Sequence, residues 1–169
     1  MQKQELPAVQ AARPPVAANL ARESGAFLSF DDVIADRAGG VSAPDRLMLM
    51  RLFRALGGAV AIFSERKVAV LDRALGLPDL PLIGSGGSEV RLGRDTPLLA
   101  GQGAEAMMTT PPFAGRPLIV FGLNGAGAEL MTVAGRRGAV CLAAEAARET
   151  LAAWLERLAP VPFDRRSAA

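Results

Sequence analysis

The stretch AFLSFDDVIAD, residues 26–36, carries the strongest clue to the fold and raises the first question about function. An apolar run that begins at Ala26 leads into Asp31 and Asp32, and Asp36 follows shortly after. A buried strand that brings carboxylates to the edge of a sheet is typical of Mg²⁺ and phosphate chemistry. The first polar residue is nevertheless Ser29, at the point where such a site needs its leading acid. The stretch therefore predicts either a phosphatase or the remains of one.

Composition predicts one soluble globular domain and excludes several kinds of chemistry. The chain has 169 residues, half of them hydrophobic, and a formal net charge of +2, which suits a single well-formed core. Because histidine is absent, Ser-His and Cys-His nucleophile pairs and imidazole zinc sites are excluded. Cys141 is the single cysteine, so no disulfide can form within the chain, and its apolar neighbours predict a buried structural thiol.

The charge pattern and the apolar runs indicate which partners to expect. Apart from the pairs Arg136-Arg137 and Arg165-Arg166, the arginines are scattered, and tyrosine is absent, so the sequence argues against nucleic-acid binding. No apolar run reaches the length of a membrane span, and the N-terminus lacks the pattern of a secretory signal. We therefore expect a cytoplasmic protein that binds neither nucleic acid nor membrane, and whose partner is another protein, a second copy of itself, or a phosphorylated small molecule.

Apolar runs that alternate with helical patterns predict an α/β fold, a Rossmann-like parallel sheet with helices on both faces. Residues 1–22 are predicted to be a flexible leader, residues 23–160 a single domain and residues 161–169 a flexible tail. The expected strands are Ala26–Phe30, Ala59–Phe63, Leu80–Ile83, Leu118–Phe121 and Ala139–Leu142. The expected helices run from Ser42 to Leu56, Val68 to Leu75, Ala126 to Ala134 and Ala146 to Leu158. The segment Gly93–Pro117 is expected to be irregular. Four of the strands are apolar nearly throughout, which predicts burial on both faces.

The polar residues that follow four of these strands are expected to meet at one edge of the sheet. Read in chain order, they resemble the motifs of haloacid dehalogenase-like phosphatases, and among these the trehalose-6-phosphate phosphatases. The family's Asp-x-Asp-Gly-Thr-Leu-x-Asp motif is similar to residues 29–36, its Ser-Gly-Arg to residues 64–66, its Gly-x-His-Gly-Ala-Glu to residues 84–89 and its Gly-Asp-Asp to residues 122–124. The resemblance implies the same parallel α/β core.

The departures from the family fall on its chemistry. The resemblance places the aspartyl nucleophile at Ser29 and the magnesium acids at Leu123 and Asn124. A serine hydroxyl is a poor nucleophile without a base, and Mg²⁺ prefers anionic oxygen ligands. Lys67 is the only lysine in the matched region, and residues 93–117 are too few for the family's cap domain. No intact catalytic residue, no metal site and no cofactor are therefore expected.

The acids that remain at the catalytic positions have two interpretations. The resemblance gives Asp31 the role of general acid and base and makes Asp36 the later acid of the motif, with Asp32 beside them. The plainer alternative is that these carboxylates cap backbone N–H groups of a loop. The positions Ser29, Asp31, Asp32 and Asp36 are therefore treated as degenerate catalytic positions.

The phosphate-binding candidates are Ser64, Arg66, Gly84 and Glu89. A hydroxyl, backbone amides and a guanidinium can hold a phosphate even without catalysis. The alternatives are that Ser64 caps the next helix, that Arg66 pairs with Glu65 or Asp31, and that the glycine-rich turn after Gly84 is a tight reversal rather than an anion nest.

Three functional hypotheses follow. The first is a catalytically inactive relative of the trehalose-6-phosphate phosphatases that serves as a regulatory, scaffold or phospho-ligand-sensing module. The second is a Mg²⁺-dependent sugar-phosphate phosphatase in which Asp31 or Asp32 has become the nucleophile. The third is an interaction domain without any ligand, and the helix Asp45–Leu56, apolar around much of its circumference, is expected to bury a second face against a partner.

Overall fold

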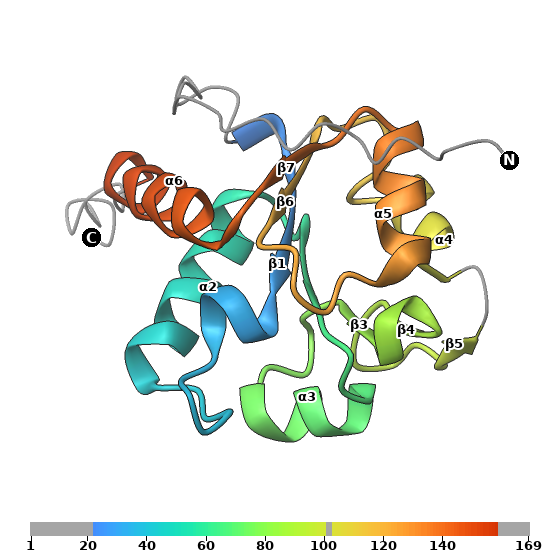
Figure 1. The fold of residues 1–169 in the computed structure, drawn as a ribbon, viewed down its shortest axis with the longest axis horizontal. Coiled ribbons are helices and arrows are strands. Elements are labelled where there is room, and N and C mark those ends of the chain that lie inside the picture. Colours follow the sequence, from blue (N-terminus) through green and yellow to red (C-terminus); the bar gives the residue numbers. More distant parts are fainter. Residues whose placement is uncertain (1–21, 101–102, 159–169) are drawn as a thin grey trace, which may run out of the picture.

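A computed structural model describes residues 22–100 and 103–158. The predicted leader and tail lie outside these residues, apart from Arg22. Figure 1 shows the described part as a central twisted sheet with helices on both sides.

Seven strands form a single sheet in the order β5-β4-β3-β2-β1-β6-β7. The strands are β1 (Gly25–Ser29), β2 (Val60–Phe63), β3 (Leu82–Gly84), β4 (Glu89–Arg91), β5 (Leu99–Ala100), β6 (Leu118–Phe121) and β7 (Val140–Leu142). The pairs among β3, β2, β1, β6 and β7 are parallel, whereas β4 and β5 add an antiparallel edge. The chain fills the sheet outward from β1 in both directions, which defines a doubly wound, Rossmann-like α/β fold as predicted.

The helices cover both faces of this sheet. They are α2 (Ala43–Ala55), α3 (Val68–Leu75), α4 (Gly103–Thr109), α5 (Gly127–Arg136) and α6 (Ala144–Arg157), with a five-residue π-helical turn at Phe30–Ile34 and a 3₁₀ turn at Ser85–Gly87. Helices α2 and α6 lie on one side of the sheet, and α4 and α5 lie on the other (Figure 1). No helix within residues 22–100 or 103–158 is both long and apolar enough to cross a membrane.

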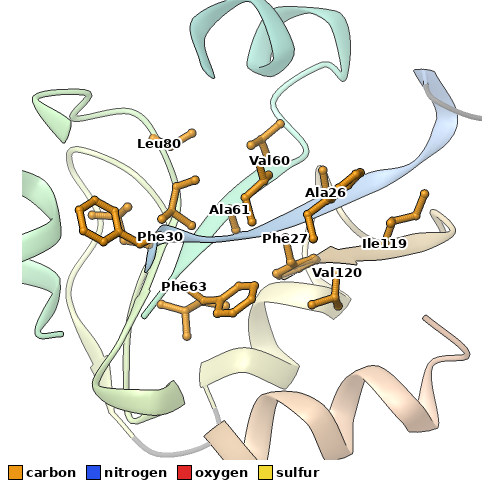
Figure 2. Close-up of a cluster of buried hydrophobic side chains, with 14 of the residues drawn as sticks. Ala26, Phe27, Phe30, Val60, Ala61, Phe63, Leu80, Ile119 and Val120 are labelled. Carbon is orange, nitrogen blue, oxygen red and sulfur yellow. The ribbon is translucent and has the colours of Figure 1, made fainter. Parts of the chain in front are cut away.

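The core is built around β1, whose five residues are all buried between β2 and β6. Figure 2 shows the apolar side chains of these three strands meeting on both faces of the sheet. Phe27 packs against Phe113 with ring centroids 4.9 Å apart, and Phe121 meets Trp154 edge-on at 5.2 Å. Burial of this apolar surface is the main driving force for the fold, and the aromatic pairs add directional packing.

The prediction of an irregular segment over residues 93–117 is wrong, because this stretch contains β5 and α4. Helix α4 buries Ala104, Met107 and Met108, which lie on one helical face at the spacing i, i+3, i+4. Gly103 starts the helix in close contact with the sheet, since a Cβ there would lie 2.4 Å from a methyl group of Val90. Burial against β4 therefore stabilises a short helix in a stretch rich in glycine, proline and threonine.

Strand β7 also departs from the prediction of burial on both faces. Val140 is 44% exposed and Cys141 is half-buried, whereas Leu142 is buried. The reason is topological, since β7 is an edge strand that α6 covers incompletely. The inner face of α6 is buried through Ala147, Leu151 and Trp154.

Helix α2 begins at the predicted cap, where Ser42 accepts a hydrogen bond from the Asp45 amide. Its inner face buries Leu49 and Leu52, whereas Leu47 and Met50 are 58% and 41% exposed. A cavity of about 230 Å³ lies between α2 and the segment that precedes β3, and its lining residues are Leu49, Met50, Phe53, Arg54, Leu77, Pro78, Asp79 and Leu80. That a partner covers this outer face stays a prediction.

A glycine contact joins α5 to the turn after β3. Gly127 has φ +66°, and a Cβ there would lie 2.1 Å from the carbonyl oxygen of Gly86. Gly138, just beyond the other end of α5, has the same φ but nothing within 4 Å of its Cβ position. A side chain at Gly138 would therefore cause backbone strain alone, whereas a side chain at Gly127 would cause the same strain and a steric clash in addition.

We expect Gly138→Ala to lower the free energy of unfolding by about 1 kcal/mol through strain alone, and Gly127→Ala to lower it by at least about 1 kcal/mol more. Urea denaturation of both variants and of the wild type measures the difference. Equal losses would show that the close approach of Gly127 to Gly86 does not constrain the fold.

Candidate functional site

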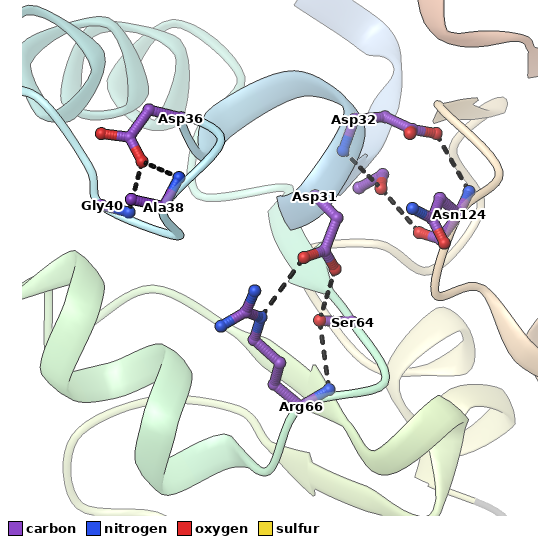
Figure 3. Close-up of polar contacts among 9 residues, drawn as sticks. Asp31, Asp32, Asp36, Ala38, Gly40, Ser64, Arg66 and Asn124 are labelled. Carbon is purple, nitrogen blue, oxygen red and sulfur yellow. Dashed lines mark hydrogen bonds and ion pairs between the residues drawn. The ribbon is translucent and has the colours of Figure 1, made fainter.

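The residues predicted to converge lie together at the carboxyl ends of β1, β2, β3 and β6, as Figure 3 shows for most of them. This placement follows from the parallel strand order, because neighbouring parallel strands present their carboxyl ends at one edge. The sequence did not predict which hydrogen bonds these side chains form. In the structure, most of their hydrogen bonds belong to two separate groups.

The first group joins the end of β1 to the loop after β6. The Ser29 hydroxyl donates to the backbone carbonyl oxygen of Asn124 at 2.6 Å and accepts from the amide of Asp32 at 3.2 Å. Ser29 is completely buried and serves as the N-cap of the π-helical turn. Its hydroxyl is therefore bonded on both sides to the backbone, as a donor to Asn124 and as an acceptor from Asp32.

Asp32 completes the same link from the opposite direction. One of its carboxylate oxygens, Oδ2, accepts hydrogen bonds from the amides of both Leu123 and Asn124, each at 3.0 Å. Gly122 permits this approach, since it has φ +84° and a Cβ there would lie 2.8 Å from the Cβ atoms of Ser29 and Asp32. The ends of β1 and β6 are thus held together by three hydrogen bonds between residues more than 90 positions apart in the chain.

These residues do not fit the magnesium ion that the resemblance implies. A divalent cation at this point needs several oxygen ligands, usually anionic ones, but Asp32 is the one carboxylate of this group, and its Oδ2 already accepts hydrogen bonds from two amides. Within the part of the chain that the structure describes, no three His, Cys, Asp or Glu side chains gather as metal ligands would. The ends of β1 and β6 are therefore joined by hydrogen bonds within the chain.

The second group consists of Asp31, Ser64 and Arg66. The Ser64 hydroxyl donates to Asp31 Oδ2 at 2.8 Å, and Arg66 Nε donates to Asp31 Oδ1 at 3.3 Å. Ser64 also accepts from the Arg66 amide at 3.1 Å, and the guanidinium lies 5.5 Å above the ring of Phe30. Of the alternatives left open by the sequence, Arg66 pairs with Asp31, and Ser64 is not the cap of α3, because Lys67 occupies that position.

Glu89 and Gly84 serve the packing of α3 against the sheet. Glu89 Oε2 accepts from the amide of Val68 at 2.9 Å, in the first turn of α3, where a carboxylate is favourable. A Cβ at Gly84 would lie 2.6 Å from the same amide nitrogen. In the turn that follows, the amides of Ser85 and Gly86 donate to the carbonyls of Arg66 and Ser64. The turn is therefore a tight reversal, and these two amides are already bonded within the chain.

Asp36 lies apart from the other acids. Its Oδ1 accepts from the amides of Ala38 and Gly40, both at 2.8 Å, so it organises an exposed loop. This is the plainer of the two interpretations made from the sequence. Figure 3 shows this carboxylate with its own two partners, separate from Asp31 and Asp32.

The role of Asp32 was missed from sequence, although a signal was present. Ser29 and Asp32 form an S-x-x-D pattern, which is typical of a helical N-terminus. The pattern identifies the bond from the Asp32 amide to Ser29. It contains no information on the loop after β6, so the two amides that Asp32 accepts from could not be named.

Cys141 is half-buried on β7, and burial raises the pKa of its thiol. A higher pKa lowers the thiolate fraction at neutral pH, and the thiolate is the reactive form. This agrees with a structural thiol rather than a nucleophile.

The fold and these contacts define a doubly wound α/β protein in which the polar groups at the strand ends are bonded largely to one another. Comparison of the sequence with protein-family models and with curated proteins finds no match. Two solved structures of Aspergillus fumigatus trehalose-6-phosphate phosphatase are similar in part, each with a TM-score of 0.42. Crystal form 2 is 24% identical over 49% of this chain and 34% of that chain, and form 3 is 20% identical over 58% and 43%. The chain thus spans less than half the length of these enzymes, and the fold class rests on its own sheet topology.

Asp32 and Asp36 make a matched pair, because each carboxylate accepts from two backbone amides, and among residues 22–100 and 103–158 neither forms an ion pair. We expect Asp32→Ala to lower the free energy of unfolding by about 1–3 kcal/mol, since it removes the acceptor of part-buried amides. Asp36→Ala should cost less than about 1 kcal/mol, because its exposed amides can bond to water. Chemical denaturation measures the free energy of unfolding of both variants. Similar decreases would mean that the link between β1 and β6 stabilises the fold no more than the hydrogen bonds of Asp36 in its exposed loop.

The thiol of Cys141 should react with iodoacetamide more slowly in the folded protein than in a short peptide of residues 138–144. The pH midpoint of the reaction should lie higher in the protein, because desolvation favours the protonated thiol. By linkage, this thiol stabilises the fold below its unfolded pKa and loses that contribution as the pH rises through its folded pKa. A midpoint at or below that of the peptide would contradict the assignment.

Proposed function

We propose that this protein is a non-catalytic relative of the haloacid dehalogenase-like phosphatases, of the trehalose-6-phosphate phosphatase type, that acts as a regulatory, scaffold or phospho-ligand-sensing module. The observation that carries the proposal is the internal bonding of the strand ends. Asp31 is bonded to Ser64 and Arg66, Asp32 to two amides of the loop after β6, and Ser29 to a carbonyl of that loop.

The absence of a competent nucleophile supports the proposal. Ser29 is buried and donates its only hydroxyl proton to the backbone carbonyl of Asn124, so this proton is engaged in a structural hydrogen bond. Asp31 has both oxygens engaged, by a hydroxyl and by a guanidinium. Both bonds stabilise the negative charge of the carboxylate, which lowers its reactivity as a nucleophile or base.

Charge neutralisation is the second requirement that the site does not meet. Phosphoryl transfer depends on positioning and on cations that stabilise the charge of the transferring group. The donor set between β1 and β6 does not fit a divalent cation, and Arg66, the arginine of this cluster, is already paired with Asp31. Glu65 adds a further negative charge beside the turn after β3, where its carboxylate lies 2.8 Å from the Cβ position of Gly86.

The outer face of α2 favours a second candidate, an interaction domain without a small-molecule ligand. Leu47 and Met50 are exposed on that face, next to the cavity that Phe53 and Leu80 help to line. The cavity lies near the amino end of β3, which Leu80 precedes, whereas Ser64 and Arg66 follow the carboxyl end of β2. A regulatory module can use both the outer face of α2 and the strand ends around Ser64 and Arg66. An interaction domain without a ligand needs only the outer face of α2.

A phosphatase assay decides the catalytic question. We expect no release of phosphate from p-nitrophenyl phosphate or trehalose 6-phosphate with Mg²⁺, above the background of Asp31→Ala protein. Turnover that Asp31→Ala abolishes and Asp79→Ala spares would overturn the proposal in favour of a phosphatase. Trapping with beryllium fluoride would then show whether Asp31 or Asp32 is the nucleophile.

Thermal denaturation separates ligand sensing from a pure interaction role. A ligand present at 100 times its dissociation constant adds about 2.7 kcal/mol to stability. An increase in Tm with trehalose 6-phosphate or inorganic phosphate supports ligand sensing. An unchanged Tm at ligand concentrations up to tens of millimolar favours the interaction domain without a ligand.

A further inference from the structure

We propose that Asp31 is an internal anion that keeps an oxyanion site closed, and that a phosphate group enters this site only by displacing the Asp31 carboxylate. The site is formed by the Ser64 hydroxyl and the Arg66 guanidinium. The proposal rests on the ligand-sensing part of the proposed function. It adds that the Asp31 carboxylate acts as a gate, because it occupies the donors until a phosphate displaces it.

Asp31 contacts the donors as a phosphate would. One carboxylate oxygen accepts from the Ser64 hydroxyl at 2.8 Å, and the other accepts from Arg66 Nε at 3.3 Å. Carboxylates and phosphates are recognised by the same arrangement of a guanidinium and a hydroxyl. The donors are therefore arranged for an oxyanion, and the chain itself supplies one.

The arrangement leaves the guanidinium only partly used. Among the described residues, none accepts a hydrogen bond from Nη1 or Nη2 of Arg66, whose side chain is 43% exposed. The contact between Nε and Asp31, at 3.3 Å, is longer than the 2.7–2.9 Å typical of charge-assisted hydrogen bonds. The backbone at Gly39 lies along the guanidinium, since a Cβ there would be 3.0 Å from Nη1. Arg66 is thus held from one side, and its Nη atoms remain as additional donors for an anion that takes the place of Asp31.

Displacement is required because two anions cannot share these donors at low cost. A phosphate that contacts Ser64 and Arg66 would lie within a few ångströms of the ionised Asp31 carboxylate, and like charges at that distance repel strongly at a partly buried site. The side chain of Asp31 is 24% exposed, so solvent screens the repulsion only in part. Removing the charge of Asp31 should therefore open the site.

The test compares two aspartates with the same ion-pair geometry. Asp31 pairs with Arg66, and Asp79 pairs with Arg94, each through Nε and Oδ1 at 3.3 Å. Asp31→Asn and Asp79→Asn remove the same charge, but only the first lies at the proposed site. Calorimetric titration with inorganic phosphate, at constant ionic strength, should show binding to Asp31→Asn that is at least about tenfold tighter than to wild type, with Asp79→Asn unchanged. Adding Arg66→Gln or Ser64→Ala to Asp31→Asn should abolish the gain.

Every other outcome would contradict the proposed displacement of Asp31, and each one shows which part of the proposal is wrong. An equal gain in Asp79→Asn would show an effect of net charge alone. Wild-type binding as tight as that of Asp31→Asn would mean that phosphate binds without displacement, so ligand sensing would survive and the gate would not. If neither protein binds phosphate, both the gate and ligand sensing fail, while the non-catalytic assignment stands on the separate phosphatase assay. Circular dichroism and thermal melts verify that each variant folds, and Asp31→Ser replaces Asp31→Asn if the latter does not.

Discussion

The link between the ends of β1 and β6 is the interaction on which the arrangement of the strand ends depends. Ser29 and Asp32 make three hydrogen bonds to the loop after β6, and they use both donors and acceptors of that loop. Because β1 lies at the centre of the sheet, fixing its end relative to β6 also sets the position of the π-helical turn. That turn carries Asp31 towards β2, where it meets Ser64 and Arg66.

The same contacts show how hydrogen bonds alone can hold neighbouring strand ends in position. A metal ion draws oxygen ligands together by its charge, whereas backbone amides draw a carboxylate by hydrogen bonding. Either can hold two strand ends at a fixed distance. In this protein Asp32, Asp31 and Glu89 each accept hydrogen bonds from donors at the strand ends or at the start of α3. The polar cluster is therefore a set of internal cross-links.

Much of the fold could be predicted from the sequence because its elements have local signals. Apolar runs marked the central strands, and the cap at Ser42 and the glycine at position 76 marked the ends of two helices. Helix α4 was missed because its three buried apolar side chains are surrounded by glycine and threonine, and its stability comes from packing against β4. Convergence of the strand ends followed from the parallel order. The partners of Asp31 and Asp32 could not be named, since they lie 33 to 92 positions away and depend on side-chain geometry.

The two outermost strands of the sheet are very short. Strand β5 has two residues and β7 has three, so each border offers few unpaired backbone groups to another chain. Val140 leaves an apolar side chain exposed on one of these borders, but so short a border gives an incoming strand little to pair with. The outline of the sheet itself thus protects the protein against edge-to-edge aggregation while its buried centre remains strongly apolar.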